Sequence, residues 1–275
     1  MSRLLRANFF RMVKNRMFWI GTVCMALIGT LLPFAHYQMM IKEDYPMYID
    51  NGFFVGAVLI GILLAVFCSL FLGTEYHDGT IRNKIIVGRT RSAIYLANLI
   101  TCIAAGFFMC AAQFILYLCA GLPLLGPFQM EPKTVLTLTL CVFLLAASLA
   151  SIFTLVAMCC QNKALTAVIC ILTAVFFLLF GAYLQTKLNE PEIYSQYQYV
   201  NDNGEIETDE AAPNPHYIGG TKRKLYEFLF DFLPGGQALQ FSNSDVKNPN
   251  LLMLYSGIMV VGTTGAGLAA FRKKI

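Results

Sequence analysis

The chain has 275 residues, of which 57% are hydrophobic and only 13% are charged. This apolar share exceeds that of an ordinary soluble domain and indicates a protein of the lipid bilayer. The basic residues behind the net charge of +4 border apolar segments, so we expect contacts with anionic lipid and no nucleic-acid partner.

Residues 1–16 are expected to form an amphipathic helix on the inner membrane surface. Leu5, Phe9 and Met12 lie on one side of this helix, and basic residues occupy the other side. The apolar run that follows is longer than a signal-peptide core and has no small-residue cleavage site after it. We therefore expect a retained anchor rather than a cleaved signal.

Six uncharged runs are long enough to cross a bilayer, which needs about 20 apolar residues. They cover residues 17–35, 53–73, 94–120, 134–158, 164–184 and 251–271. If both termini are cytoplasmic, the cytoplasmic side holds 13 of the 20 basic residues and only two of the 16 acidic ones. The sequence thus predicts an all-α polytopic membrane protein with six transmembrane helices in one domain, residues 1–275, with both termini cytoplasmic.

A polar loop, residues 73–96, separates the second and third spans. A short amphipathic helix is expected to begin at Thr80, its candidate N-cap, directly after the Asp78-Gly79 turn. The apolar face of this helix consists of Ile81, Ile85 and Ile86. A basic loop that only fixes the topology is the alternative interpretation.

The order of residues in this loop resembles that of bacterial type 2 (ABC-2) permeases of ATP-binding-cassette (ABC) transporters. Glu75 precedes Gly79-Thr80-Ile81-Arg82, which is followed by Val87-Gly88-Arg89-Thr90-Arg91-Ser92. The resemblance implies a cytoplasmic coupling helix that docks on a separate ATPase subunit. The implied contact residues are Glu75, Tyr76, His77, Asp78, Gly79, Thr80 and Arg82. Glu75 is the first candidate, because a carboxylate among basic residues is well placed to pair with a partner's cation.

Residues 185–250 form an extracellular loop between spans five and six. Its first half is acidic, and residues 197–200 and 205–208 are expected to pair as a small hairpin. The ligand order of a calcium loop is absent, so a solvated acidic surface is the preferred interpretation.

The second half of this loop predicts an outer helix, capped by Thr221 and ended by Pro234-Gly235-Gly236. One or two further turns are expected after it. The apolar stripe of the outer helix consists of Leu225, Phe228, Leu229, Phe232 and Leu233. In type 2 permeases, which this arrangement also resembles, external helices between the last two spans cover the translocation path.

Sequence motifs for catalysis are missing. The chain has no phosphate-binding loop, no zinc-protease motif and no nucleophile elbow. The apolar runs contain no ionisable residue, which disfavours a proton-coupled secondary transporter or an intramembrane enzyme. We predict no catalytic residue, metal or cofactor in this chain, with ATP and Mg bound by the partner subunit.

The resemblance implies the membrane subunit of an ATP-driven exporter of the bacterial plasma membrane. Two permease chains, as a homodimer, would pair with two ATPase subunits and pass an amphipathic or hydrophobic cargo. Size and loop pattern resemble most the exporters of antimicrobial or cytolytic peptides, including lantibiotic and bacitracin resistance systems and the phenol-soluble-modulin exporter. Expected wall residues are Phe176, Phe177, Phe180 and Tyr183. The alternative is a receptor or scaffold with a ligand-binding outer loop.

Overall fold

The computed structural model describes residues 1–43, 46–160, 162–194, 197–200, 206–209 and 212–273. The α-helices in these residues are α1 (Ser2–Lys14), α2 (Arg16–Glu43), α3 (Gly56–His77), α4 (Thr80–Ile86), α5 (Arg91–Leu125), α6 (Pro132–Cys159), α7 (Lys163–Asn189), α8 (Gly220–Phe232), α9 (Pro234–Ser242) and α10 (Pro249–Lys273). The other elements are the 3-10 helix η1 (Ile49–Asn51) and the strands β1 (Ile193–Tyr194), β2 (Tyr197–Val200), β3 (Ile206–Asp209) and β4 (Ala212–Pro213).

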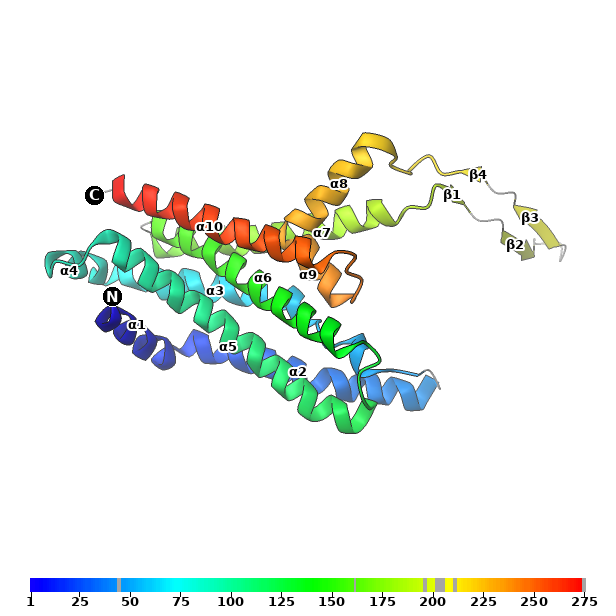
Figure 1. The fold of residues 1–275 in the computed structure, drawn as a ribbon, viewed down its shortest axis with the longest axis horizontal. Helices are drawn as coiled ribbons and strands as arrows, with labels where there is room; N and C mark the ends of the chain where they lie inside the picture. The colour runs from blue at the N-terminus through cyan, green and yellow to red at the C-terminus, as the bar shows by residue number, and fades with distance from the viewer. Residues whose placement is uncertain (44–45, 161, 195–196, 201–205, 210–211, 274–275) are drawn as a thin grey trace.

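Six helices of the described chain are long and apolar enough to cross a membrane: α2, α3 (with η1 before it), α5, α6, α7 and α10. They run along the longest axis of the molecule, and both chain ends lie at the end that carries α1 and α4 (Figure 1). An even number of crossings returns the chain to the side from which it started. The predicted all-α fold with six candidate spans is confirmed.

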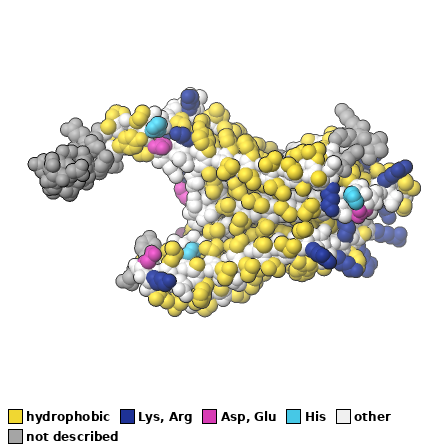
Figure 2. Space-filling model, turned by 180° about the vertical axis from the view of Figure 1, so that it is seen from behind, with side chains coloured by type: hydrophobic (Ala, Val, Ile, Leu, Met, Phe, Trp, Pro, Cys, Tyr) yellow, Lys and Arg dark blue, Asp and Glu magenta, His cyan; other side chains and the backbone are white. Residues whose placement is uncertain are grey.

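The surface of the molecule separates apolar from basic residues. A broad hydrophobic band covers the middle of the bundle, and Lys and Arg gather at the end that carries α4 (Figure 2). We call this the basic end. The opposite end, here the outer end, carries α8, α9 and the strands (Figure 1).

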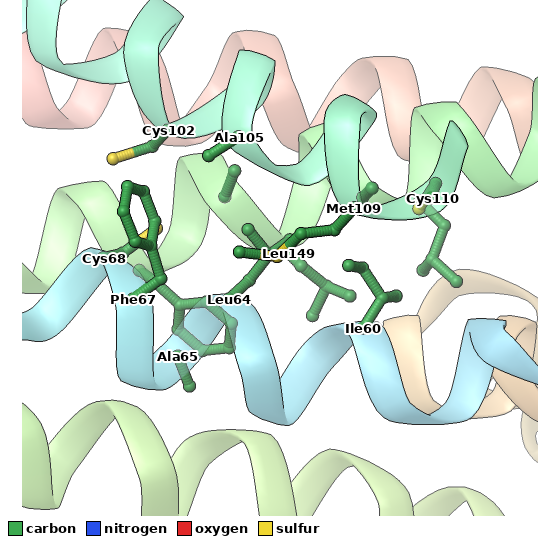
Figure 3. Packing of buried hydrophobic residues seen from close by; sticks show 14 of the residues in the cluster. Ile60, Leu64, Ala65, Phe67, Cys68, Cys102, Ala105, Met109, Cys110 and Leu149 are labelled. Carbon is green, nitrogen blue, oxygen red and sulfur yellow. The ribbon is translucent and has the colours of Figure 1, made fainter. Parts of the chain in front are cut away.

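The core lies where α3, α5 and α6 meet. Buried side chains interdigitate there. Among those labelled in Figure 3 are Ile60, Leu64 and Cys68 from α3, Cys102, Ala105 and Met109 from α5, and Leu149 from α6. Around this centre, α2 packs chiefly along α5, α10 along α6, and α7 along α3 and α9. The spans α7 and α10 are the least enclosed of the six, so most of their apolar surface faces outward from the bundle.

Several helices extend beyond the apolar runs that predict them. Helix α2 continues through Pro33 to Glu43, and α5 continues through Pro123 to Leu125. A proline removes only one helical hydrogen bond, so the helix can continue past it with a local bend. Each of the six runs therefore coincides with one of the six long apolar helices, but the predicted ends of these two helices come too early.

The outer segment contains two antiparallel strand pairs. Strand β2 pairs with β3, with Tyr197 opposite Asp209, and β1 pairs with β4. The expected pairing is thus present, although the second strand begins one residue later than predicted. The turn at residues 201–205 lies outside the described residues.

Helix α8 differs from its prediction at both ends. Its N-cap is Gly219, so Thr221 lies inside the first turn and does not cap the helix. Pro234-Gly235-Gly236 does not simply end the outer helix but begins α9, with Pro234 at a first-turn position where its missing N–H costs no hydrogen bond. The further turns expected after it are this nine-residue helix.

Candidate functional site

Helix α4 lies at the tip of the basic end, between the second and third spans (Figure 1). The chain leaves α3 through Gly79, whose φ of 67° is a left-handed conformation that favours glycine. The sequence predicts Thr80 as the N-cap, but the N-cap is Gly79 and Thr80 is the first residue of the helix. The Thr80 hydroxyl instead donates to the Glu75 carbonyl at 3.1 Å, which ties the start of α4 to the last turn of α3.

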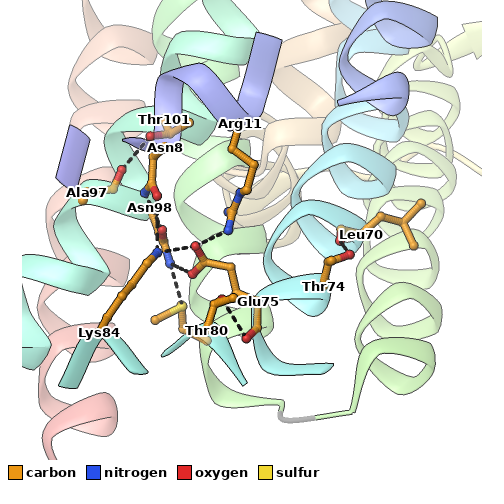
Figure 4. Close-up of polar contacts among 11 residues, drawn as sticks. Asn8, Arg11, Leu70, Thr74, Glu75, Thr80, Lys84, Ala97, Asn98 and Thr101 are labelled. Atoms are coloured by element: carbon orange, nitrogen blue, oxygen red, sulfur yellow. Dashed lines mark hydrogen bonds and ion pairs between the residues drawn. The ribbon is translucent and has the colours of Figure 1, made fainter. Parts of the chain in front are cut away.

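The Glu75 carboxylate is fully buried beneath α4 and collects donors from three other helices. Its Oε1 is ion-paired with Arg11 of α1 and with Lys84 of α4, and its Oε2 accepts from Nδ2 of Asn98 in α5 at 2.9 Å (Figure 4). Each carboxylate oxygen is therefore satisfied. We call Glu75, Arg11, Lys84, Asn98 and Asn8 the Glu75 network.

The two asparagines extend the Glu75 network. Asn8 donates to Asn98 Oδ1 at 2.7 Å and accepts from Lys84 Nζ at 3.3 Å, and both asparagines are buried. Nearby, the Tyr76 hydroxyl donates to the Met158 carbonyl of α6 at 2.7 Å. Five helices, α1, α3, α4, α5 and α6, are thus held to one another by polar contacts at the base of α4.

The charges of the Glu75 network are unequal, since one carboxylate meets two cations. Burial lowers the pKa of the Lys84 ammonium, and the adjacent Glu75 carboxylate opposes this shift. The Arg11 guanidinium stacks over the Phe71 ring at 4.0 Å, a contact that partly replaces its lost hydration. The network is therefore strongly dependent on Glu75, its one anion among the described residues.

For Glu75, the structure changes our interpretation. The sequence predicts that Glu75 pairs with a cation of the partner. In the structure its carboxylate is buried and already paired with Arg11 and Lys84 of the same chain, so it is not accessible to a partner. His77, Asp78 and Arg82 are exposed, with His77 Nδ1 3.0 Å from Asp78 Oδ1, whereas Tyr76, Gly79 and Thr80 are half-buried. Of the seven residues singled out, three thus present their side chains at the surface of the tip.

Two large apolar side chains that are not among the implied ATPase contacts are strongly exposed at the end of α4, on its last residue and on its C-cap. Ile86 and Val87 are 72% and 77% exposed, while Ile81 of the same helix is buried and Ile85 packs against the core. Shallow apolar grooves flank the helix on either side. Bulky apolar side chains beyond the spans, beside basic residues, are typical of a protein contact surface.

The four expected wall residues of α7 separate into two groups. Phe176, Phe180 and Tyr183 form a stacked row, with ring centroids 5.5 and 6.3 Å apart, and Phe176 and Tyr183 are exposed. Phe177 packs against the core instead and does not belong to this exposed row. The row continues to Tyr226 of α8, whose ring centroid lies 6.4 Å from that of Tyr183.

Helix α8 rests on the outer end of α10 through its aromatic stripe. Phe228 and Phe232 stack on each other, and both rings meet Tyr255 of α10 edge-on. Leu225 and Phe228 remain about half exposed, Leu229 is half-buried, and no residue of α8 is fully buried. Such a helix is held by few apolar contacts, a feature of elements that can move.

The fold and the basic tip define a multi-pass membrane protein with a short helix presented outside the bilayer region. The family model of the ABC-2 family transporter proteins matches residues 4–182, which is well over half of the chain. The chain therefore belongs to the ABC-2 transporter family. Among curated proteins, no significant match was found.

Family membership settles the class of function. The chain is the membrane component of an ABC-2 type transporter, a permease domain that has no ATPase activity of its own and works with ABC ATPase subunits. The receptor or scaffold alternative is therefore set aside. The matched stretch ends within α7, so the outer segment and α10 lie beyond it.

Proposed function

We propose that this permease is half of an exporter in which α4 is the coupling helix that receives a cytosolic ATPase subunit. The observation that carries the proposal is the combination at the tip: α4 is fixed to the spans by the Glu75 network and still exposes Ile86 and Val87. The basic end would lie in the cytoplasm, as the excess of Lys and Arg there favours.

The Glu75 network gives α4 a mechanical connection to the bundle. A displacement of α4 by the ATPase would act on α3 through the Gly79 turn, on α5 through Asn98 and on α1 through Arg11. Buried, hydrogen-bonded ion pairs resist separation because an unpaired charge left in the interior is costly. Closure of two ATPase subunits would thus be transmitted to several spans together, as a rigid-body movement.

The exposed face of α7 is our candidate for the cargo path. Its aromatic row, Phe176, Phe180 and Tyr183, together with Tyr226, supports an apolar wall that leads to the outer end. In a complex of two permeases and two ATPases, a second copy of this chain would face this wall. Such a wall suits an amphipathic or hydrophobic cargo, and we propose antimicrobial or cytolytic peptides as the class.

One assay tests both parts of the proposal. The permease is co-purified with its ATPase in lipid nanodiscs, and ATP turnover is measured with and without an amphipathic peptide. Val87→Asp is expected to weaken ATPase binding at least about tenfold, because a carboxylate would be buried in an apolar contact. Ile41→Asp, at an apolar position that is 64% exposed near the C-terminal end of α2, is the matched control and should bind normally.

The path variant has a different expected outcome in the same assay. Phe176→Asp should leave ATPase binding and basal turnover intact and remove stimulation by the peptide, because Phe176 is exposed and lies in the middle of α7, whereas α4 lies at the tip of the basic end. Normal binding by Val87→Asp would contradict the docking surface. Unchanged peptide stimulation in Phe176→Asp would contradict the path while leaving the docking surface in place.

A further inference from the structure

A polar cavity of about 260 Å³ lies at the outer end, where α7 ends and α10 begins beneath α8. Its size is close to the lower limit of small-molecule sites, which start near about 300 Å³. The end of α7, one face of α8, Gln240 of α9 and the loop into α10 form its walls. Charged side chains of both signs line it: Arg223, Lys247, Glu227, Asp231 and Asp245.

Arg223 supplies an unused donor to this cavity. Its Nε pairs with Glu227 at 3.3 Å and its Nη2 donates to the Leu188 carbonyl at 3.1 Å, which fixes the guanidinium plane. Its Nη1 is buried and has no hydrogen-bond partner among the described residues. Since buried donors are nearly always satisfied in folded proteins, this nitrogen calls for an acceptor that enters the cavity.

The opposite charge is provided by Asp231. Its Oδ1 accepts from Gln240 Nε2 at 3.0 Å, so the carboxylate is held in place by α9. Burial and the neighbouring Glu227 carboxylate raise the pKa of Asp231, while the Gln240 hydrogen bond and Lys247 oppose the shift. A ligand ammonium next to Asp231 would likewise favour its ionised form. Lys247 and Asp245 lie on the exposed rim.

We propose that this cavity binds a small zwitterion, an amino acid or short peptide, with its carboxylate on Arg223 and its ammonium on Asp231. A fixed guanidinium with a free N–H is suited to a carboxylate oxygen, and a positioned carboxylate suits an ammonium. A molecule with only one charged end would meet either Arg223 or Asp231 but would bring no opposite charge to the other. The site is separate from the coupling helix and does not depend on the proposed export function.

Such a ligand would also fix α8. This helix has no fully buried residue, while the cavity joins it to α7, α9 and the start of α10. A molecule bridging Arg223 and Asp231 of α8 to the surrounding walls would add contacts that α8 lacks when the cavity is empty. Binding should therefore slow amide hydrogen exchange in α8 without altering exchange in α4.

The test is calorimetric titration of the purified full chain in nanodiscs, without any ATPase, with trialanine as the probe. Trialanine amide lacks the carboxylate, and N-acetyl-trialanine lacks the ammonium. Binding of trialanine, with loss of at least about tenfold in affinity on blocking either end, is the expected result, because each end makes a charge-assisted hydrogen bond.

Variants show whether the measured heat of trialanine binding arises in this cavity. Arg223→Gln and Asp231→Asn are each expected to weaken trialanine binding by about tenfold or more, because each variant removes the charge that pairs with one end of the peptide. Lys224→Gln, an exposed position of α8 outside the cavity, is the control and should bind as the wild type. Absence of trialanine binding, equal binding of either blocked peptide, or unchanged binding in Arg223→Gln would overturn the proposal.

Discussion

Replacing Glu75 with alanine is expected to lower the free energy of unfolding by about 3–5 kcal/mol, the usual effect of removing one partner from a buried ion pair. Arg11 and Lys84 would then face each other without an anion, and Asn98 would lose its acceptor. Because the network holds α1 and α4 to the bundle, the loss should be accompanied by detachment of both helices.

The measurement is unfolding in mixed detergent micelles, followed by limited proteolysis of α1 and the α3–α4 turn. Asp78→Ala is the matched control, since this exposed carboxylate contacts only its neighbour His77 among the described residues and should cost less than about 0.5 kcal/mol. Equal stability of the two variants, with α1 still protected, would show that the network does not hold the tip together.

Gly235→Val is expected to be the most disruptive single change at the outer end, with a loss of about 3 kcal/mol or more. A Cβ at Gly235 would overlap with the carbonyl of Phe177 in α7, and one at Gly181 would lie 2.7 Å from the Gly235 carbonyl carbon. Both obstacles are backbone atoms, so no side chain can move aside. Helices α7 and α9 approach each other this closely only because glycine is present at both Gly181 and Gly235.

Thermal unfolding in detergent and the yield of folded protein report this effect. Gly257→Val in α10 is the control, because a Cβ there meets no atom within 4 Å. We expect the control to behave as the wild type and Gly235→Val to lose the docking of α9 on α7, and with it the support of α8. A folded Gly235→Val protein with an unchanged unfolding temperature would contradict the close helix crossing.

The sequence indicated the spans well because each is one uninterrupted apolar run, a signal that depends on local composition alone. The helix ends were harder to predict. Helix α2 continues to Glu43 because a helix satisfies its backbone in water as well as in lipid, so polarity does not stop it. The sequence predicts Thr80 and Thr221 as helix caps, but a preceding glycine supplies the N-cap in both cases.

The position of the candidate site in the sequence was predictable, but the contacts among its side chains were not. Glu75 looked available because its loop is polar, and its burial depends on Asn8, Arg11 and Asn98, which are far from it in sequence. One signal was present: Asn98 is an amide inside a long uncharged run, where a polar side chain is expected to find a partner. Nothing in the loop distinguished the exposed Ile86 from the buried Ile81.

The most direct test of the account places a photo-crosslinking amino acid at position 86, on the exposed face of α4, and identifies the crosslinked product in intact cells. We predict a product that joins this chain to an ATPase with a phosphate-binding loop. We predict no such product from the same amino acid at position 41, which is also exposed and lies near the C-terminal end of α2. Crosslinks from position 86 only to lipid, or to a protein without ATPase activity, would contradict the assignment of α4 as the coupling helix.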